Sequence, residues 1–145
     1  LKAVITQNID GLHQKAGSRE VLELHGSVLR NYCERCGAFY GLDTILHSTG
    51  VPRCPACGGD IKPDVVLYEE SLDQEVLAKA VHYIRQADLM IIGGTSLAVY
   101  PAAGLLQYFR GDAVVQINRD HTSYDARATL SLHESIGKVL GALRV

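Results

Sequence analysis

Short apolar runs alternate with amphipathic segments along most of the chain. The runs have the length of single strands and lie at residues 2–6, 65–68, 89–92, 113–117 and 129–132. Such runs predict buried strands. The segments 72–86 and 102–109 and the end of the chain after residue 135 predict helices. This alternation predicts an α/β fold, with a partial Rossmann-like parallel sheet that carries helices on both faces.

Two of the predicted helices have a start signal. Ser71 and Gln74 form a capping-box pattern before the first helix, and Ser131 and Glu134 repeat that pattern before the last. The apolar residues of the last helix recur at helical spacing, at Ile136, Val139, Leu140 and Leu143. This spacing predicts that the chain closes on an amphipathic helix.

A stretch with few core-forming residues interrupts the alternation, and it holds all four cysteines. They form two C-x-x-C pairs, Cys33 with Cys36 and Cys54 with Cys57, separated by seventeen residues. This spacing is typical of a four-cysteine site that closes around one structural zinc. A redox dithiol would explain one pair but not both, and two disulfides are disfavoured in a chain without an export signal. We therefore predict one zinc per chain.

Composition and charge narrow the class of protein. With 47% hydrophobic and 21% charged residues, the 145-residue chain has the composition of a folded protein with one main core. We expect one Rossmann-like domain, made of residues 1–32 and 60–145, with residues 33–59 as a zinc-binding insert. The net charge of −2 argues against direct binding to nucleic acid or to a membrane surface.

A run of 21 residues without a charge, 89–109, is long enough to raise the possibility of a membrane span. Gly93, Gly94 and Pro101 interrupt it, so it predicts a strand, a turn and a short helix instead. The chain begins at Leu1 without a basic segment leading into an apolar one. We therefore expect no secretion and a cytoplasmic location, and a start without Met suggests a truncated start.

Polar residues follow several predicted strands, where open α/β sheets bind ligands. Residues 7–10 follow the first strand, and their amide and carboxylate groups suit a ribose or a carboxamide, although Asn8 and Asp10 could equally cap the next helical turn. Residues 94–96 precede a helix, in a position where N–H groups and hydroxyls can meet a phosphate. Residues 118–120 could reach the same crevice. Both of these segments could also be simple turns.

A single histidine, His25, lies between an apolar run and Gly26. A histidine in this setting is more often structural than catalytic. Imidazoles nevertheless titrate close to neutral pH, which makes His25 the best candidate for a general base in the chain.

Five motifs occur in one order along the chain. They are TQNIDGLH at 6–13, ELHGS at 23–27, the two C-x-x-C pairs, GTSLAVYPA at 94–102 and INR at 117–119. Together they resemble the sirtuin family of NAD-dependent protein deacylases, and the resemblance extends over nearly the whole chain.

The resemblance implies that NAD is a consumed co-substrate. The acyl oxygen of an acylated lysine attacks the nicotinamide ribose, nicotinamide leaves, and the acyl group ends on ADP-ribose. His25 would deprotonate a ribose hydroxyl of the intermediate. The NAD site would be formed by Gln7, Asn8, Ile9, Asp10, Gly94, Thr95, Ser96, Asn118, Arg119, Asp120 and Ile136. The acylated-lysine protein or peptide would add as a strand beside Val65, Val66, Leu67, Tyr68, Leu97 and Val99.

The chain departs from the family in two places. Family members usually read Phe-Gly-Glu where this chain has Tyr68, Glu69 and Glu70. The Gly-Ala-Gly-x-Ser loop that opens the family and would hold the pyrophosphate does not occur in this sequence. We therefore expect the chain to be the carboxyl-terminal two-thirds of a sirtuin, with little activity alone.

Two other functions are open to a chain of this kind. One is a non-catalytic, zinc-containing interaction module derived from such an enzyme, and the other is a zinc-ribbon binder of nucleic acid. The presence of Asn8, Asp10 and His25 favours the enzyme, because an interaction module needs none of them. Only four Lys or Arg residues lie in or beside the insert, which disfavours nucleic acid.

Overall fold

The chain divides into two compact units, Leu1–Leu77 and Ala78–Val145, in a computed structural model that describes residues 1–143. Among these residues no helix has the length and apolarity needed to cross a membrane. The predicted division into a Rossmann-like domain and an insert stays a prediction.

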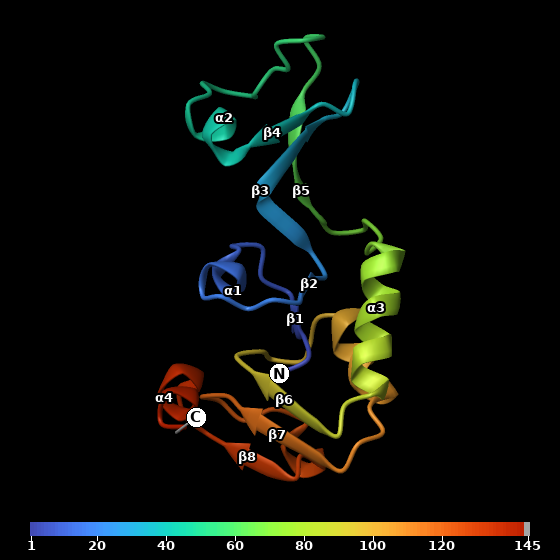
Figure 1. Cartoon of the computed structure of the whole chain (residues 1–145), viewed down its shortest axis with the longest axis vertical. Helices are drawn as coiled ribbons and strands as arrows, with labels where there is room; N and C mark the ends of the chain where they lie inside the picture. The colour runs from blue at the N-terminus through green and yellow to red at the C-terminus, as the bar shows by residue number, and fades with distance from the viewer. Residues whose placement is uncertain (144–145) are drawn as a thin grey trace. The chain divides into compact units, whose positions relative to one another are not determined.

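The first unit contains a two-stranded parallel sheet and a three-stranded antiparallel sheet (Figure 1). Its elements are β1 (Val4–Thr6), α1 (Leu12–Lys15), β2 (Val21–Glu23), β3 (Gly26–Cys33), β4 (Phe39–Gly41), α2 (Leu42–Leu46) and β5 (Ile61–Val65). β1 and β2 pair in parallel, with Thr6 opposite Glu23. β3 is the central strand of the antiparallel sheet, between β4 and β5. Leu22, Leu24 and Leu72 are buried in this unit.

The second unit is built on a three-stranded parallel sheet in the order β6-β7-β8 (Figure 1). α3 (Gln74–Arg85) crosses the boundary between the units. The other elements are β6 (Leu89–Gly93), the 3₁₀ helix η1 (Ala102–Tyr108), β7 (Ala113–Ile117), the 3₁₀ helix η2 (Asp125–Arg127), β8 (Leu130–Leu132) and α4 (Ile136–Gly141). Buried apolar residues include Ala80, Ile84, Ile92, Leu105, Val114 and Ile117. Parallel sheets with helices confirm the predicted α/β fold class.

Three local predictions were wrong. The strand expected at 65–68 is β5, which ends at Val65, because its antiparallel pairing with β3 runs over residues 61–65. α3 is capped by Asp73, whose Oδ1 accepts the N–H groups of Glu75 and Val76 at 2.8 and 3.0 Å, and not by Ser71. At α4 the cap residue is Ser135 rather than Ser131, which belongs to β8.

A tight turn over residues 67–70 follows β5. The Glu70 carboxylate accepts the N–H of Leu67 at 2.8 Å and pairs with Lys62 at 2.7 Å. These bonds lower the pKa of Glu70, the Leu67 N–H having the larger effect. Glu69 has a φ of 71°, a left-handed conformation that L-residues with a Cβ rarely adopt. It stands at the position where the sirtuin motif has glycine, so this chain keeps a backbone suited to glycine while carrying a glutamate.

Replacement of this residue by glycine should stabilise the protein. Glycine removes the cost of a left-handed conformation, which is larger than the entropy that glycine gains in the unfolded chain. We therefore expect Glu69→Gly to raise the free energy of unfolding by roughly 0.5–1 kcal/mol. Thermal melts of the full-length protein measure this. Glu69→Ala is the matched control, because it removes the same carboxylate and keeps the Cβ. A gain for alanine equal to that for glycine would show that the charge, not the backbone, matters.

Candidate functional site

The first candidate site lies where β1 and β2 end side by side. The N–H of Leu24 donates to the Thr6 carbonyl at 2.9 Å, so the chain leaves β2 beside the loop that follows β1. His25 comes next, and its Nδ1 lies 3.1 Å from the carbonyl oxygen of Gln7. Because a carbonyl oxygen only accepts, Nδ1 carries the proton in this bond, and in the neutral imidazole Nε2 is therefore the nitrogen with the lone pair. His25 is half-buried and is held in the tautomer that can act as a base.

The other predicted residues of the loop have different surroundings. The Ile9 carbonyl accepts the N–H of Val28 at 3.0 Å, which ties the loop to β3. The Asp10 carboxylate accepts the N–H of Leu12, the first residue of α1, at 3.0 Å, but the cap position of this helix is Gly11. Asn8 is exposed. Ile9 therefore anchors the loop through its main chain, and Asn8 and Asp10 present polar groups at its surface.

A glycine has to follow His25. Gly26 has a φ of 73°, and a Cβ at this position would lie 1.9 Å from the carbonyl oxygen of Asp64 on β5. Only glycine allows β3 and β5 to approach so closely here. The placement of His25 therefore depends on its neighbour having no side chain.

The second candidate site is a cavity of about 460 Å³ in the second unit. Its lining includes every residue of this unit that was predicted to bind NAD, namely Gly94, Thr95, Ser96, Asn118, Arg119, Asp120 and Ile136. They meet because β6, β7 and β8 run parallel and end at the same edge of the sheet. The cavity is also lined by five residues that were not among the predicted ones: Ile117, His121, Thr122, Glu134 and Ser135. Glu134 and Ser135 follow β8 as 118–120 follow β7, so the same rule could have found them.

Asn118 joins two walls of this cavity. Its Oδ1 accepts the N–H of Thr95 at 3.0 Å, and its Nδ2 donates to the Thr95 carbonyl at 2.7 Å. The Asn118 side chain is buried. Since both ends of the amide bind one residue of the loop after β6, Asn118 positions that loop.

The third candidate site is the cluster of four cysteines. All four sulfurs lie within 4.8 Å of one another, with Cys33 3.4 Å from Cys57 and Cys36 3.7 Å from Cys54. Four sulfurs at about 2.3 Å from a tetrahedral zinc would lie roughly 3.8 Å apart. The cluster therefore fits one zinc, and four thiolates would leave no open position for a substrate.

Two turns of the same geometry present these cysteines. The Cys33 carbonyl accepts the N–H of Gly37, and the Cys33 N–H donates to the Ala38 carbonyl. Cys54 makes the same two bonds, with the N–H of Gly58 and the carbonyl of Gly59. Gly37 and Gly58 have φ of 70° and 74°, a left-handed conformation that favours glycine. The Tyr40 hydroxyl donates to Cys54 at 3.0 Å. This bond lowers the pKa of the Cys54 thiol to about 6 and raises the pKa of Tyr40 to about 12.

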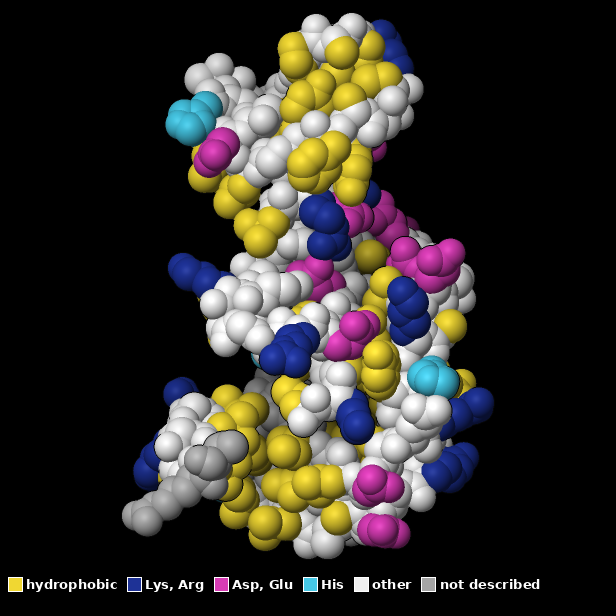
Figure 2. All heavy atoms as spheres, in the orientation of Figure 1, with side chains coloured by type: hydrophobic (Ala, Val, Ile, Leu, Met, Phe, Trp, Pro, Cys, Tyr) yellow, Lys and Arg dark blue, Asp and Glu magenta, His cyan; other side chains and the backbone are white. Residues whose placement is uncertain are grey.

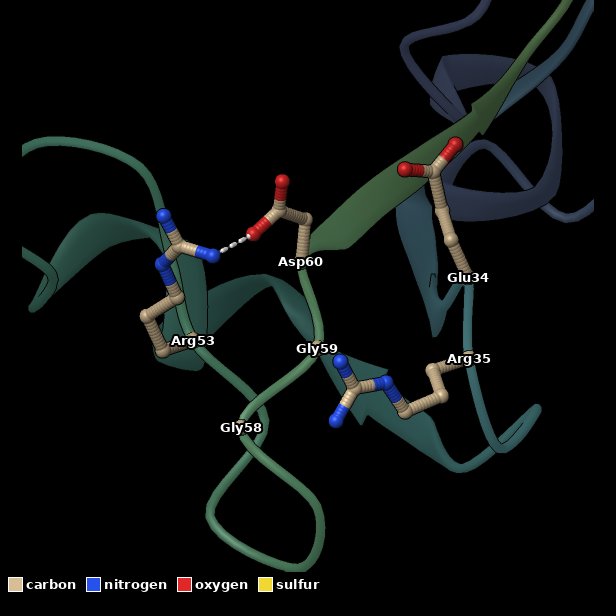
Figure 3. Close-up of a pocket in the computed structure, with 6 residues that line it drawn as sticks. All are labelled: Glu34, Arg35, Arg53, Gly58, Gly59 and Asp60. Atoms are coloured by element: carbon tan, nitrogen blue, oxygen red, sulfur yellow. Dashed lines mark hydrogen bonds and ion pairs between the residues drawn. The ribbon is translucent and has the colours of Figure 1, made fainter.

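A small polar cavity of about 270 Å³ lies beside these turns (Figure 3). It is lined by Glu34, Arg35, Arg53, Gly58, Gly59 and Asp60. Arg53 pairs with Asp60, and Arg35 donates to the Cys57 carbonyl at 2.9 Å. Both guanidinium groups are thus engaged within the protein, and they brace the cysteine turns.

The residues predicted to bind the peptide fall in two segments, one in each unit. In the first unit the N–H of Val66 donates to the His25 carbonyl at 3.1 Å, and Tyr68 is 99% exposed. In the second unit Leu97 has a φ of 56°, and Val99 is exposed. The peptide-binding role of these residues stays a prediction.

Comparison with known proteins settles the family. The pattern of the Sir2 family matches residues 1–101. The chain belongs to the Sir2 family. It is 62% identical over 142 residues to the NAD-dependent protein deacetylase of Clostridium perfringens, a match that covers 97% of this chain and 58% of that protein. It is 47% identical to the enzyme of the same name from Staphylococcus aureus strain Mu50, with 97% and 57% covered. The chain thus spans less than two-thirds of these Sir2 relatives.

Solved Sir2 structures have the same fold. A complex described as Sir2, p53 peptide and NAD+ matches with a TM-score of 0.88 and 42% identity, over 96% of this chain and 60% of that chain. Sir2Tm bound to a propionylated peptide matches with a TM-score of 0.90 and 43% identity, over 96% and 61%.

The cysteine cluster predicts one zinc per chain in the full-length protein, measurable by elemental analysis. Cys54→Ser leaves three thiolates, and this variant should bind much less zinc. Because zinc binding contributes to folding, its free energy of unfolding should fall by roughly several kcal/mol. Proteolysis between residues 32 and 59 should then accelerate. Thr44→Ala, an exposed change on α2 in the same segment, should keep both the metal and the resistance. Well under one zinc in the unmodified protein, with oxidised thiols, would contradict the assignment.

The pairing of Asn118 with Thr95 predicts a strong effect of a small change. Asn118→Asp replaces the donor facing the Thr95 carbonyl with an acceptor, and should lower the free energy of unfolding by about 1–3 kcal/mol. Thermal melts provide the measurement. Asn8→Asp makes the same chemical change at an exposed site and should have little effect. Equal melting temperatures for the two variants would mean that the Asn118 amide is not needed.

Proposed function

We propose that the complete protein is an NAD-dependent protein lysine deacylase that acts as a deacetylase. It would convert NAD and an acylated lysine into nicotinamide, O-acyl-ADP-ribose and the free lysine. The Sir2 relatives support this proposal. In the match to the Clostridium perfringens protein, the chain covers 58% of that protein's length. Low activity of the 145-residue chain by itself stays a prediction.

The observation that carries this proposal is the setting of His25. The Gln7 carbonyl holds Nδ1–H at 3.1 Å, and Nε2 is therefore the atom that can take up a proton from a ribose hydroxyl. Gln7, Asn8 and Asp10, which we assign to the nicotinamide and its ribose, belong to the same loop. A base and the hydroxyl that it deprotonates would thus be neighbours.

NAD supplies the ADP-ribosyl group that receives the acyl group. The cavity of about 460 Å³ in the second unit has a volume in the range of ligand sites. Its loop 94–96, with N–H groups and hydroxyls, and the cation of Arg119 suit ribose and phosphate. The zinc at the four cysteines would be structural.

The proposed partner is an acylated-lysine protein or peptide, bound along residues 65–68 and at Leu97 and Val99. The exposure of Tyr68 and Val99 supports this assignment. We place the protein in the cytoplasm, where four free cysteines would stay reduced and able to bind zinc.

A second candidate function, a non-catalytic interaction module, has one observation in its favour. Four large apolar side chains in or beside the four-cysteine segment are exposed, namely Tyr32, Phe39, Leu46 and Val51. Figure 2 shows hydrophobic atoms gathered on the surface of this part of the chain. Tyr32 and Phe39 pack edge to face, with ring centroids 5.6 Å apart. Such a patch suits a protein partner. An interaction module would, however, leave the hydrogen bond that orients His25 without a function.

The base assignment predicts the behaviour of His25→Ala in the full-length protein. Turnover, measured as nicotinamide released in the presence of an acetyl-lysine peptide, should fall by roughly 10²–10⁴-fold, the usual contribution of general-base catalysis. The affinity for NAD should change much less, because the base acts after binding.

His47 provides the matched control. Its Nδ1 also lies close to a backbone carbonyl, that of Asp43 at 2.8 Å, but at an exposed site after α2. His47→Ala should leave turnover unchanged. Near-normal turnover in well-folded His25→Ala protein would remove His25 from the reaction, and no nicotinamide release by the unmodified protein would favour the interaction module.

A further inference from the structure

Two histidines and one carboxylate converge in the second unit beside its cavity, and the proposed reaction gives none of the three a chemical role. His121 follows β7, Asp125 begins η2, and His133 follows β8. One ligand atom of each lies within 4.8 Å of the other two. Nδ1 of His121 is 2.7 Å and Nε2 of His133 is 3.5 Å from the same oxygen, Oδ2 of Asp125.

The Asp125 carboxylate is held in a fixed orientation by its other oxygen. Oδ1 accepts the N–H and the hydroxyl of Thr122 at 3.1 and 3.0 Å, and Nε2 of Gln116 at 2.6 Å. Gln116 is 1% exposed, so this support is a buried amide. Oδ2 is thereby left to face the two imidazoles. Hydrogen bonds of this kind to a ligating carboxylate are typical of metal sites.

The charge and the exposure of the cluster also suit a cation. An aspartate carboxylate is ionised at neutral pH, so Asp125 offers negative charge to an ion. The His121 side chain is 83% exposed, that of His133 33% and that of Asp125 20%. An ion could therefore enter from solvent and keep water as its remaining ligands.

We propose that His121, Asp125 and His133 bind one divalent transition-metal ion. Two imidazoles and a carboxylate suit Zn²⁺ or Ni²⁺. Ligand atoms about 2.0–2.1 Å from a tetrahedral ion lie roughly 3.3 Å apart, which is close to the present nitrogen-to-oxygen separations of 2.7 and 3.5 Å. The ion binds the lone pairs of His121 Nδ1 and His133 Nε2, so any proton on either nitrogen is released to solvent. This site does not rest on the proposed deacylase activity.

The position of the site connects it to the cavity of the second unit. His121 and Thr122 both line that cavity, and Thr122 also binds the Asp125 carboxylate. A bound ion would place positive charge at the rim of the cavity. The site is separate from the four cysteines, none of which lies in this unit.

The test is a titration of the full-length protein with Ni²⁺, in which calorimetry measures the binding. The protein is first loaded with one equivalent of Zn²⁺ to occupy the cysteines. We expect one Ni²⁺ to bind per chain and to raise the melting temperature. The double variant His121→Ala/His133→Ala should weaken the binding at least 10-fold. The control His47→Ala/His82→Ala removes two other histidines and should leave the binding unchanged.

Two further measurements keep the result unambiguous. The single variant His121→Ala changes a side chain that is 83% exposed, so it should fold normally and still weaken Ni²⁺ binding. A chromophoric chelator reports any zinc that is set free. The proposal fails if the protein takes up no Ni²⁺, if the His121 variants bind it as tightly as the unmodified protein, or if binding releases an equal amount of zinc from the cysteines.

Discussion

Parallel strand pairing is the constraint on which the candidate sites of this protein depend. Parallel strands end at the same edge of a sheet, and whatever follows them is brought together. In the second unit the pairing of Gly93 with Ile117 and of Ile117 with Leu132 aligns the three strand ends. Three segments distant in sequence, 94–96, 118–122 and 134–136, thereby line one cavity. The shorter pairing of β1 with β2 places His25 beside the loop after β1 in the same way.

The four-cysteine segment follows a different physical rule. Its buried cluster is small and consists of Cys33, Cys54 and Ile61, far less apolar surface than a segment of this size needs to hold its shape. Two turns with the same hydrogen bonds face each other across four sulfurs instead. Metal binding can replace a hydrophobic core because its free energy is folding free energy.

Buried amides hold the polar loops of the second unit in place. Asn118 binds both backbone groups of Thr95, and Gln116 supports the carboxylate of Asp125. Gln116 lies on β7, the central strand of the sheet, and Asn118 follows the end of that strand, so a strand paired on both sides positions both amides. The loops that line the cavity thus owe their order to two side chains that are themselves buried.

The amino-acid sequence by itself determined the α/β class, the family, the four-cysteine cluster and most of the residues around the cavity. These follow from local composition and from motif spacing, which do not depend on distant contacts. Sequence patterns were least reliable at the ends of elements. Ser71 and Asp73 are both good capping residues, and only the course of the chain into α3 selected Asp73.

Only the tertiary structure decided three features of the sites. It fixed the tautomer of His25, because that depends on the Gln7 carbonyl eighteen residues away. It showed Glu69 in a left-handed conformation, because the turn closed by Glu70 imposes it. It brought His121, Asp125 and His133 together, because β8 separates them in sequence while its parallel register returns His133 to the edge where β7 ends. Side-chain geometry of this kind arises from strand pairing, and no local pattern in the sequence encodes it.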